Sequence, residues 1–209
     1  MTDFQKKLKS LLSDEDLKIR EKAVEQMSQH YEIMLKWNKT HNLTRIVSLE
    51  DASHKHYLDC ILGFNFVSEK GCLHDMGSGA GFPGIIGAIL RPQQKFFLVE
   101  PARKRATFLK QVKSVLGLNN VHILNQRAET VMNAEGVISR GTFSWPTLSP
   151  LLDPLIPGGN VYLWIGQSPS EAVFRTAIQD LGHGCSWGSY DLGSAGIRNL
   201  GMVHKQKNS

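Results

Sequence analysis

The sequence lacks a long hydrophobic run, because its apolar stretches are far shorter than the roughly 20 residues that span a bilayer. The segment Met1–Lys7 lacks the apolar core of a signal peptide. Cysteine is scarce: Cys60, Cys72 and Cys185 are odd in number and have no metal-binding spacing. These absences exclude a membrane-spanning protein and a disulfide framework. We therefore expect a cytoplasmic protein with reduced thiols, without a bound metal and without membrane contact.

Acidic residues are too few to balance the basic ones, and the 209-residue chain carries a net charge of +5. The excess is local, since residues 91–113 hold seven lysines and arginines against one acid, Glu100. Such a cluster predicts a polyanionic partner, of which nucleic acid is the commonest. A solvated helix face would also explain these charges, and charge alone leaves both explanations open.

The first third of the chain has the apolar spacing of helices and no strand pattern. This spacing predicts helices over residues 3–12 and 14–37, and a further helical stretch over 51–66. Ser13, followed by three acidic residues, is the expected N-cap of the second helix. We therefore expect residues 1–66 to form a helical N-terminal extension.

Residues 67–209 alternate between short apolar runs and amphipathic stretches, which is typical of a parallel sheet with helices on both faces. The expected strands cover residues 72–76, 95–100, 121–124, 136–139, 160–165, 184–190 and 197–204. The expected helices cover residues 83–90, 102–116, 148–155 and 170–181. The predicted fold class of this main domain is α/β.

A glycine-rich loop follows the first expected strand of this domain, with Gly77, Gly79, Gly81 and Gly84. In an open α/β sheet, ligands bind at the carboxyl ends of the strands. Glycines there let the backbone turn tightly and approach a ligand closely. A structural turn would explain one or two of the four glycines, so the loop predicts a ligand site.

The loop matches two kinds of ligand. Gly79-x-Gly81-x-x-Gly84 fits the dinucleotide fingerprint, although that match alone is weak. Glu100 lies 21 residues beyond Gly79, at the end of the second expected strand. A carboxylate at this position accepts hydrogen bonds from the hydroxyls of a ribose, and both NAD and S-adenosylmethionine carry a ribose. Glu100 therefore does not distinguish the two ligands.

Three neighbouring features favour S-adenosylmethionine. Asp75 precedes Gly77 by two residues, giving the order of the first motif of Rossmann-like methyltransferases. Pro83 lies where a pyrophosphate-binding helix would need free N–H groups. Finally, Leu155–Gly159 before a strand resembles a late motif of the same methyltransferases.

A narrower resemblance runs in order from about residue 30 to residue 165. The motifs that carry it are Leu35–Thr44 with its Trp-Asn-Lys, His56–Cys60, Asp75–Gly84 with its Gly-Phe-Pro-Gly, Lys104–Leu109, Gln126–Glu129 and Ile138–Arg140. Together they resemble the bacterial small-subunit ribosomal RNA guanine-N7 methyltransferase family, RsmG (GidB). The Trp-Asn-Lys and Gly-Phe-Pro-Gly elements make the resemblance specific, because they are not general methyltransferase features.

The resemblance implies a Rossmann-like, S-adenosylmethionine-dependent methyltransferase fold with a mostly parallel seven-stranded sheet and an N-terminal helical extension. It implies methylation of N7 of one guanine in 16S ribosomal RNA, with the free RNA or the small-subunit particle as partner. We also expect a monomer. Guanine N7 carries a lone pair and no proton, so the reaction needs placement rather than a general base. This agrees with a sequence in which no convincing acid–base pair is found.

The expected donor-binding residues follow from the same resemblance. Family cofactor positions fall on Gly77, Phe82, Ala128, Glu129 and Arg140, with Asp75, Gly79 and Glu100 beside them. We expect Phe82 to pack on the donor, and Ala128 with Glu129 to lie near its adenine ring. An internal ion pair is the alternative role for Arg140, and a plain surface acid is the alternative for Glu129.

The expected RNA-binding residues are Arg103, Lys104, Arg105 and Arg127. The first three occupy the first turn of a helix, where cations oppose the macrodipole. A sequence selected for stability alone would place acids there, so these cations predict contact with phosphates. Arg127 follows another strand at the same edge of the sheet, and an internal ion pair is its alternative role.

The sequence departs from the family pattern on the substrate side. Ile165 replaces the family lysine after the fifth strand, Gly141 replaces an alanine, and Pro101 replaces a small polar residue. The alternative is therefore that this protein is a relative of the family that binds RNA without catalysis or acts on a different target. An NAD-dependent oxidoreductase is a further alternative. His56 and Asp59 are expected to tie the extension to the core rather than to contact substrate.

Overall fold

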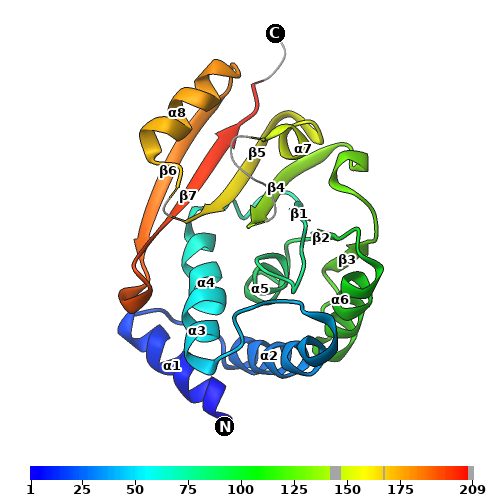
Figure 1. Cartoon of the computed structure of the whole chain (residues 1–209), viewed down its shortest axis with the longest axis vertical. Coiled ribbons are helices and arrows are strands. Elements are labelled where there is room, and N and C mark those ends of the chain that lie inside the picture. Colours follow the sequence, from blue (N-terminus) through cyan, green and yellow to red (C-terminus); the bar gives the residue numbers. More distant parts are fainter. Residues whose placement is uncertain (142–146, 167, 207–209) are drawn as a thin grey trace.

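A seven-stranded sheet forms the centre of the molecule, with the strand order β3-β2-β1-β4-β5-β7-β6 (Figure 1). The computed structural model describes residues 1–141, 147–166 and 168–206. The strands are β1 Leu73–Met76, β2 Phe96–Val99, β3 Val121–Leu124, β4 Ala134–Arg140, β5 Leu155–Ile165, β6 Gly184–Asp191 and β7 Ile197–His204.

The first five strands pair in parallel, and β7 lies antiparallel between β5 and β6. The predicted mostly parallel sheet of seven strands is therefore confirmed. The strand order reverses beside β1, because β2 and β3 extend to one side of it and β4 begins the other. Such a switch point leaves a crevice at the carboxyl ends of the strands. The glycine-rich loop after Met76 lies there.

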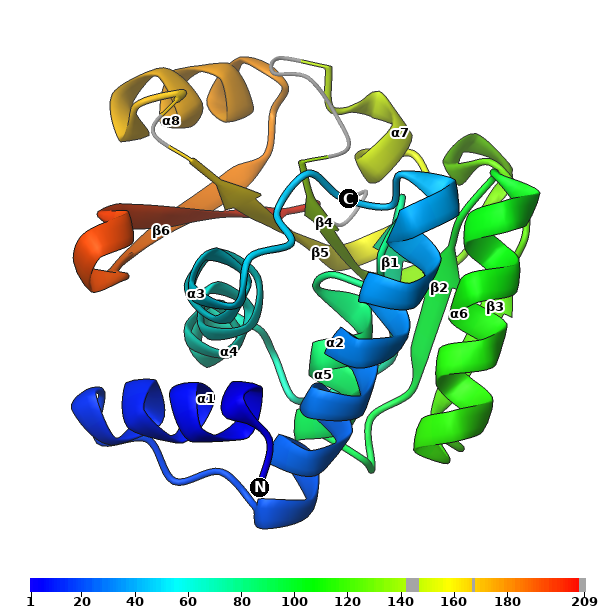
Figure 2. The same cartoon turned by 60° about the horizontal axis from the view of Figure 1, so that its bottom comes forward.

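Helices cover both faces of the sheet. The helices of the main domain are α5 Gly84–Leu90, α6 Arg103–Leu116, α7 Ser149–Leu152 and α8 Glu171–Asp180, with short 3-10 turns at Ala128–Thr130 and Gly193–Ala195. Alternate residues of β4 face opposite ways: Ile138 joins the core formed with α5 and α6, whereas Val137 joins the core formed with α7 and α8. Figure 2 shows the sheet between these two layers.

The first 66 residues are helical and pack on the α5–α6 face. Their elements are α1 Asp3–Asp14, α2 Glu21–His41, α3 Leu49–Ala52, a π-helical segment Ser53–Leu58, α4 Asp59–Gly63 and a 3-10 turn Phe64–Phe66. Met27 and Met34 of α2 have no solvent exposure, and they share one core with Ile85 of α5 and Phe108 of α6. The extension therefore completes the core of the sheet.

Two helix boundaries predicted from the sequence are wrong at the start of the chain. Ser13 does not cap the second helix, because α1 continues through it to Asp14. Thr2 caps α1 instead, in a capping box with Gln5 that satisfies the first backbone N–H groups. The chain then turns through Asp16, which has a φ of 51°, and α2 begins only at Glu21.

The helix predicted over residues 148–155 is also wrong in extent. It is one turn, Ser149–Leu152, and β5 starts at Leu155. Pro157-Gly158-Gly159 precede the strand predicted over residues 160–165, but they lie inside β5, where the register with β4 shifts between Ala134 and Gly136. A bulge of this kind absorbs the irregular residues without ending the strand. Across residues 1–141, 147–166 and 168–206, no helix is long and apolar enough to cross a membrane.

Candidate functional site

The loop between β1 and α5 folds back on itself through its glycines. Gly77, Gly79 and Gly81 have φ values of 76°, 54° and 91°, a region that side chains disfavour. The N–H of Gly77 donates to the carbonyl of Val99 at 2.9 Å, and the N–H of Gly81 donates to the carbonyl of Ser78 at 2.7 Å. The loop is thereby fastened to the end of β2.

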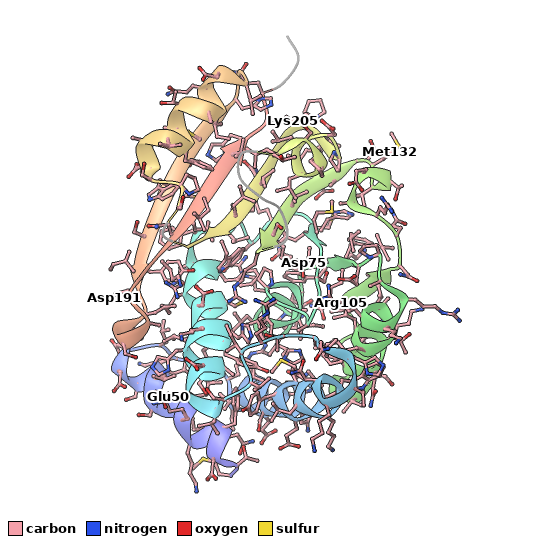
Figure 3. All side chains as sticks on the ribbon, viewed as in Figure 1. Glu50, Asp75, Arg105, Met132, Asp191 and Lys205 are labelled. Carbon is pink, nitrogen blue, oxygen red and sulfur yellow. The ribbon has the colours of Figure 1, made fainter. Side chains whose placement is uncertain are left out.

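Asp75 lies beneath this loop near the centre of the molecule and is completely buried (Figure 3). Its Oδ2 accepts the N–H of Gly84 at 3.1 Å. A Cβ at Gly84 would lie 2.5 Å from that oxygen, so this approach requires glycine. The other oxygen, Oδ1, has no hydrogen-bond partner among the described residues. Burial raises the pKa of Asp75 to about 7.

The unpartnered oxygen of Asp75 fits a cofactor that carries a donor or a positive charge. A buried acceptor without a partner is uncommon in folded proteins, and functional sites account for part of the exceptions. S-adenosylmethionine carries both an ammonium and a sulfonium group. The residues present therefore fit this cofactor.

Glu100 holds the loop from the end of β2. Its side chain is 2% exposed, and its Oε2 accepts the N–H of Gly79 at 2.9 Å. Its Oε1 accepts the N–H of Ala102 at 2.8 Å, at the start of α6. Each carboxylate oxygen keeps a second lone pair. Glu100 can therefore organise the loop and still accept ribose hydroxyls.

Phe82 closes the loop on its extension side. Its ring stacks on His56 at 4.4 Å between centroids and meets Tyr57 edge-on at 5.2 Å. The side chain is buried, with 6% exposure. The sequence predicts packing of this ring on the donor, whereas its described ring contacts are with side chains of the protein: His30, His56, Tyr57 and the guanidinium of Arg140. Packing on the donor stays a prediction.

Arg140, at the end of β4, ties the extension to the sheet. Its Nε lies 2.9 Å from Oδ2 of Asp59, and its Nη1 lies 3.1 Å from Nδ1 of His56. Its Nη2 donates to the carbonyl of Lys55, and its guanidinium lies 5.9 Å from the Phe82 ring centroid. The expected tie through His56 and Asp59 is present, and so is the internal ion pair that the sequence left open.

The protonation of His56 follows from these contacts. Its Nδ1 faces a guanidinium, which only donates, so Nδ1 accepts and the proton resides on Nε2. That nitrogen lies 3.0 Å from Oγ1 of Thr44. Burial, and then the charge of Arg140, lower the pKa of His56 to about 3. His56 is therefore neutral and unsuited to act as a base.

The remaining expected donor residues follow β3 in a 3-10 turn. Ala128 is 8% exposed, and Glu129 and Arg127 are exposed. The hydrophobic core beneath this turn includes Ala128 together with Met76 and Val99, which end β1 and β2. The structure thus brings the three strand ends together, with Glu129 and Arg127 facing solvent.

The cationic residues of α6 lie outside this crevice. Arg103, Lys104 and Arg105 are all exposed, and they form the first turn of α6 directly after Glu100 and its neighbours. These three side chains are exposed on α6, whereas Asp75 is completely buried. They can therefore contact a large partner while Asp75 and Glu100 face the crevice.

Comparison with known proteins decides the family. A family model described as GidB, rRNA small subunit methyltransferase G, matches residues 23–180. A relative named Ribosomal RNA small subunit methyltransferase G from Francisella philomiragia is 33% identical over 164 residues, which are 78% of this chain and 80% of the relative. The protein of that name from Francisella tularensis is 34% identical over 72% of this chain and 74% of its own length. This chain belongs to the GidB family.

Solved structures agree with the fold of a GidB protein. Magnesium protoporphyrin IX methyltransferase from Synechocystis, with bound SAM, has a TM-score of 0.60 at 13% identity, covering 85% of this chain and 97% of that one. A SAM-dependent methyltransferase from Aquifex aeolicus has a TM-score of 0.58 at 17% identity, covering 82% and 97%. The Rossmann-like methyltransferase fold is therefore confirmed.

This GidB protein has a cavity of about 450 Å³ at the carboxyl ends of β4 and β5. Its lining includes Asp59, Arg140, Trp164, Ile165 and Arg198. Ile165, which replaces the family lysine, faces this cavity from the end of β5. Arg198 reaches it from β7, whose Asn199 pairs with Ile165. The cavity therefore has two guanidinium groups despite the isoleucine.

Two polar residues near the site escaped sequence reasoning. Arg198 lies in the last 40 residues, where the family resemblance fades. His30 is completely buried in α2, with Nε2 2.9 Å from the carbonyl of Ala80 in the loop. One signal could have found it: His30 lies three residues beyond Met27 on an apolar helix face, where a polar side chain needs a partner. Within the described ranges, no group of three or more His, Cys, Asp or Glu residues could hold a metal ion.

Proposed function

We propose that this chain is an S-adenosylmethionine-dependent methyltransferase that methylates N7 of a guanine in 16S ribosomal RNA. The observation that carries the proposal is the glycine-rich loop held between two buried carboxylates, Asp75 and Glu100, in a member of the GidB family. The relatives' name, ribosomal RNA small subunit methyltransferase G, supports small-subunit RNA as the acceptor.

Bound S-adenosylmethionine supplies an electrophilic methyl group on a positively charged sulfur. Transfer of that methyl group to the N7 lone pair of guanine would form a carbon–nitrogen bond and break the carbon–sulfur bond, leaving the positive charge on the guanine ring and S-adenosylhomocysteine neutral. No proton moves, so the protein needs no general base. Its residues bind the donor, align the acceptor and exclude water.

The donor-binding residues act from the strand ends. Asp75 faces the cationic methionine part, and Gly77 and Gly79 let the backbone pass close to the donor. Glu100 accepts ribose hydroxyls, and Ala128 with Glu129 lies along the adenine. Phe82 packs on the donor, and Arg140 at the end of β4 completes the donor site.

The RNA-binding residues act from the surface. Arg103, Lys104 and Arg105 contact phosphates at the start of α6, and Arg127 extends this surface beyond β3. Phosphate contacts dominate affinity for nucleic acids and position the acceptor. The protein acts as a monomer in the cytoplasm, where ribosomal RNA is found.

Two measurements test the proposal. Calorimetry with S-adenosylmethionine should show binding, and with NAD it should show none. Nucleoside mass spectrometry of 16S RNA from a strain lacking the gene should show one N7-methylguanosine fewer than the parent strain. An unchanged N7-methylguanosine content would contradict the proposed acceptor.

A retargeted relative is the second candidate function, because Ile165 removes a cation that the family has beside the acceptor. Incubating the protein with labelled donor and unmodified small-subunit RNA separates the two. Label in N7-methylguanosine supports the proposal, and label in another nucleoside supports retargeting.

A further inference from the structure

His30 of α2 joins the helical extension directly to the glycine-rich loop. It is completely buried, and both ring nitrogens have partners. Nδ1 lies 2.8 Å from the hydroxyl of Tyr57, and Nε2 lies 2.9 Å from the carbonyl oxygen of Ala80. The ring also meets Phe82 edge-on at 5.1 Å. His30 therefore contacts the backbone of the loop at Ala80 and a side chain of the loop at Phe82.

The direction of these hydrogen bonds is fixed. A carbonyl oxygen only accepts, so Nε2 of His30 carries a proton and donates it to Ala80. Burial lowers the pKa of His30 to about 4, so the ring is neutral and carries one proton. Nδ1 must then accept, and the Tyr57 hydroxyl donates to it. The chain of bonds runs one way, from Tyr57 through His30 to Ala80.

The peptide unit between Ala80 and Gly81 is held from both sides. Its carbonyl accepts from His30, and its N–H donates to the carbonyl of Ser78. The N–H of Gly79, one residue earlier, is held by Glu100. The loop is therefore clamped between the sheet, through Glu100, and the extension, through His30. Gly81 has a φ of 91°, so this peptide is in a conformation that needs such support.

We propose that His30 is a positioning residue for the methyl donor, because its hydrogen bond to Ala80 holds the glycine-rich loop in the shape that binds the donor. The inference rests on the proposed function, in that the ligand of the loop is taken to be S-adenosylmethionine. His30 touches neither donor nor acceptor in this role. Because His30 already holds the loop in place, less conformational entropy is lost when the donor binds.

Two variants of His30 separate positioning from packing. The side-chain amide of glutamine reaches about as far as Nε2, whereas that of asparagine reaches only as far as Nδ1. His30→Gln therefore keeps a donor to Ala80, and His30→Asn loses it, while both remove the imidazole ring. Tyr31→Phe is the matched control. Tyr31 lies in the same helix as His30, but its hydroxyl donates to the carbonyl of Val47 at 2.8 Å and not to the glycine-rich loop.

The experiment measures the Kd for S-adenosylmethionine by calorimetry and the melting temperature of each variant, then KM for the donor and kcat. His30→Asn should raise the Kd and the donor KM about threefold to tenfold, the effect of one net hydrogen bond, with kcat at saturating donor changed less. His30→Gln should bind within about twofold of the unaltered chain. Tyr31→Phe should melt earlier and bind the donor normally.

Equal donor affinity in folded His30→Asn and in the unaltered chain would overturn the inference. So would equal losses in His30→Asn and His30→Gln, because packing alone would then explain both. If the unaltered chain itself binds no donor, the proposed function falls and this inference falls with it. Donor binding by the unaltered chain, with no difference between the two His30 variants, removes only the inference.

Discussion

The guanidinium of Arg140 and the carboxylate of Asp59 form an ion pair, 2.9 Å between Nε and Oδ2, that joins the end of β4 to α4. The Asp59 side chain is 4% exposed and the Arg140 side chain 19% exposed. The hydroxyl of Tyr190 on β6 donates to Asp59 as well, at 2.9 Å. Asp59 therefore connects three parts of the fold.

Asp59→Ala should lower the free energy of unfolding by about 3 kcal/mol, because it removes the buried carboxylate that balances the charge of Arg140. Urea denaturation checks this. Glu171→Ala is the matched control, since it removes an acid from the exposed pair with Arg175. We expect it to leave stability nearly unchanged. Equal effects of the two substitutions would contradict the role assigned to Asp59.

Replacing Arg103, Lys104 and Arg105 together by alanine should abolish most RNA methylation and leave donor affinity unchanged. The slope of log affinity against log salt should become shallower by about 0.7 for each phosphate of a single-stranded RNA that the variant no longer neutralises. Stability should not fall, because these cations oppose the dipole of α6.

The control for that variant removes equal charge elsewhere, by alanine at Lys6, Lys9 and Lys22 of α1 and α2. RNA affinity measured by filter binding at several salt concentrations distinguishes them. A similar loss in both variants would mean that net charge, rather than this surface, binds the RNA.

Donor affinity should increase between about pH 6 and pH 8. Burial raises the pKa of Asp75 to about 7, so the carboxylate that attracts the cationic donor forms across this range. Asp75→Asn should bind more weakly and lose this pH dependence, as measured by calorimetry. Glu135→Gln is the control, since Glu135 accepts the N–H of Cys72 at 2.9 Å near the opposite end of β1. A pH-dependent Asp75→Asn protein would show that another group titrates.

His30 should make the fold sensitive to acid. Its folded pKa of about 4 lies below the ordinary 6.5, so the unfolded chain binds a proton that the folded chain excludes between these values. The contribution of His30 to the free energy of unfolding is complete above pH 6.5. It is lost as the pH falls toward 4, by about 1 kcal/mol per pH unit. Stability curves of the unaltered chain and His30→Gln should therefore converge over this window. Parallel curves would show that His30 titrates normally.

Arg198→Ala should raise the KM for RNA several-fold without changing the Kd of the donor. Arg198 lines the cavity that Ile165 also faces, beside Arg140, and it gives this cavity a cation from β7. Arg175→Ala on the exposed side of α8 is the control. Steady-state kinetics with varied RNA measures the difference, and an unchanged KM would place the acceptor elsewhere.

The central strands β1, β2, β4 and β5 were predictable because they are mostly buried. Continuous apolar runs such as Phe96–Val99 are typical of parallel strands covered on both faces. The ends of elements were less predictable, since they depend on competing local interactions. Ser13 has the composition of a cap, yet the capping box at Thr2 starts a helix that runs through it.

The candidate site was predictable where its signal is local. The glycines and Asp75 lie in one short motif, residues 75–84, and Glu100 ends the next strand. His30 and Ala80 are 50 residues apart, and Arg140 and Asp59 are 81 apart, so sequence alone does not reveal which partners their side chains have. The boundary at residues 66 and 67 stays a prediction.

The core shared by Met27, Met34, Ile85 and Phe108 has a consequence for engineering and for evolution. Side chains from α2 fill the space between α5 and α6, so their shapes must match those of the sheet-covering helices. Exchange of the extension between two relatives would leave voids or overlaps beneath the loop. The helical extension and the sheet-covering helices therefore share one core, and we expect an exchanged extension to lower stability unless the facing core residues are exchanged with it.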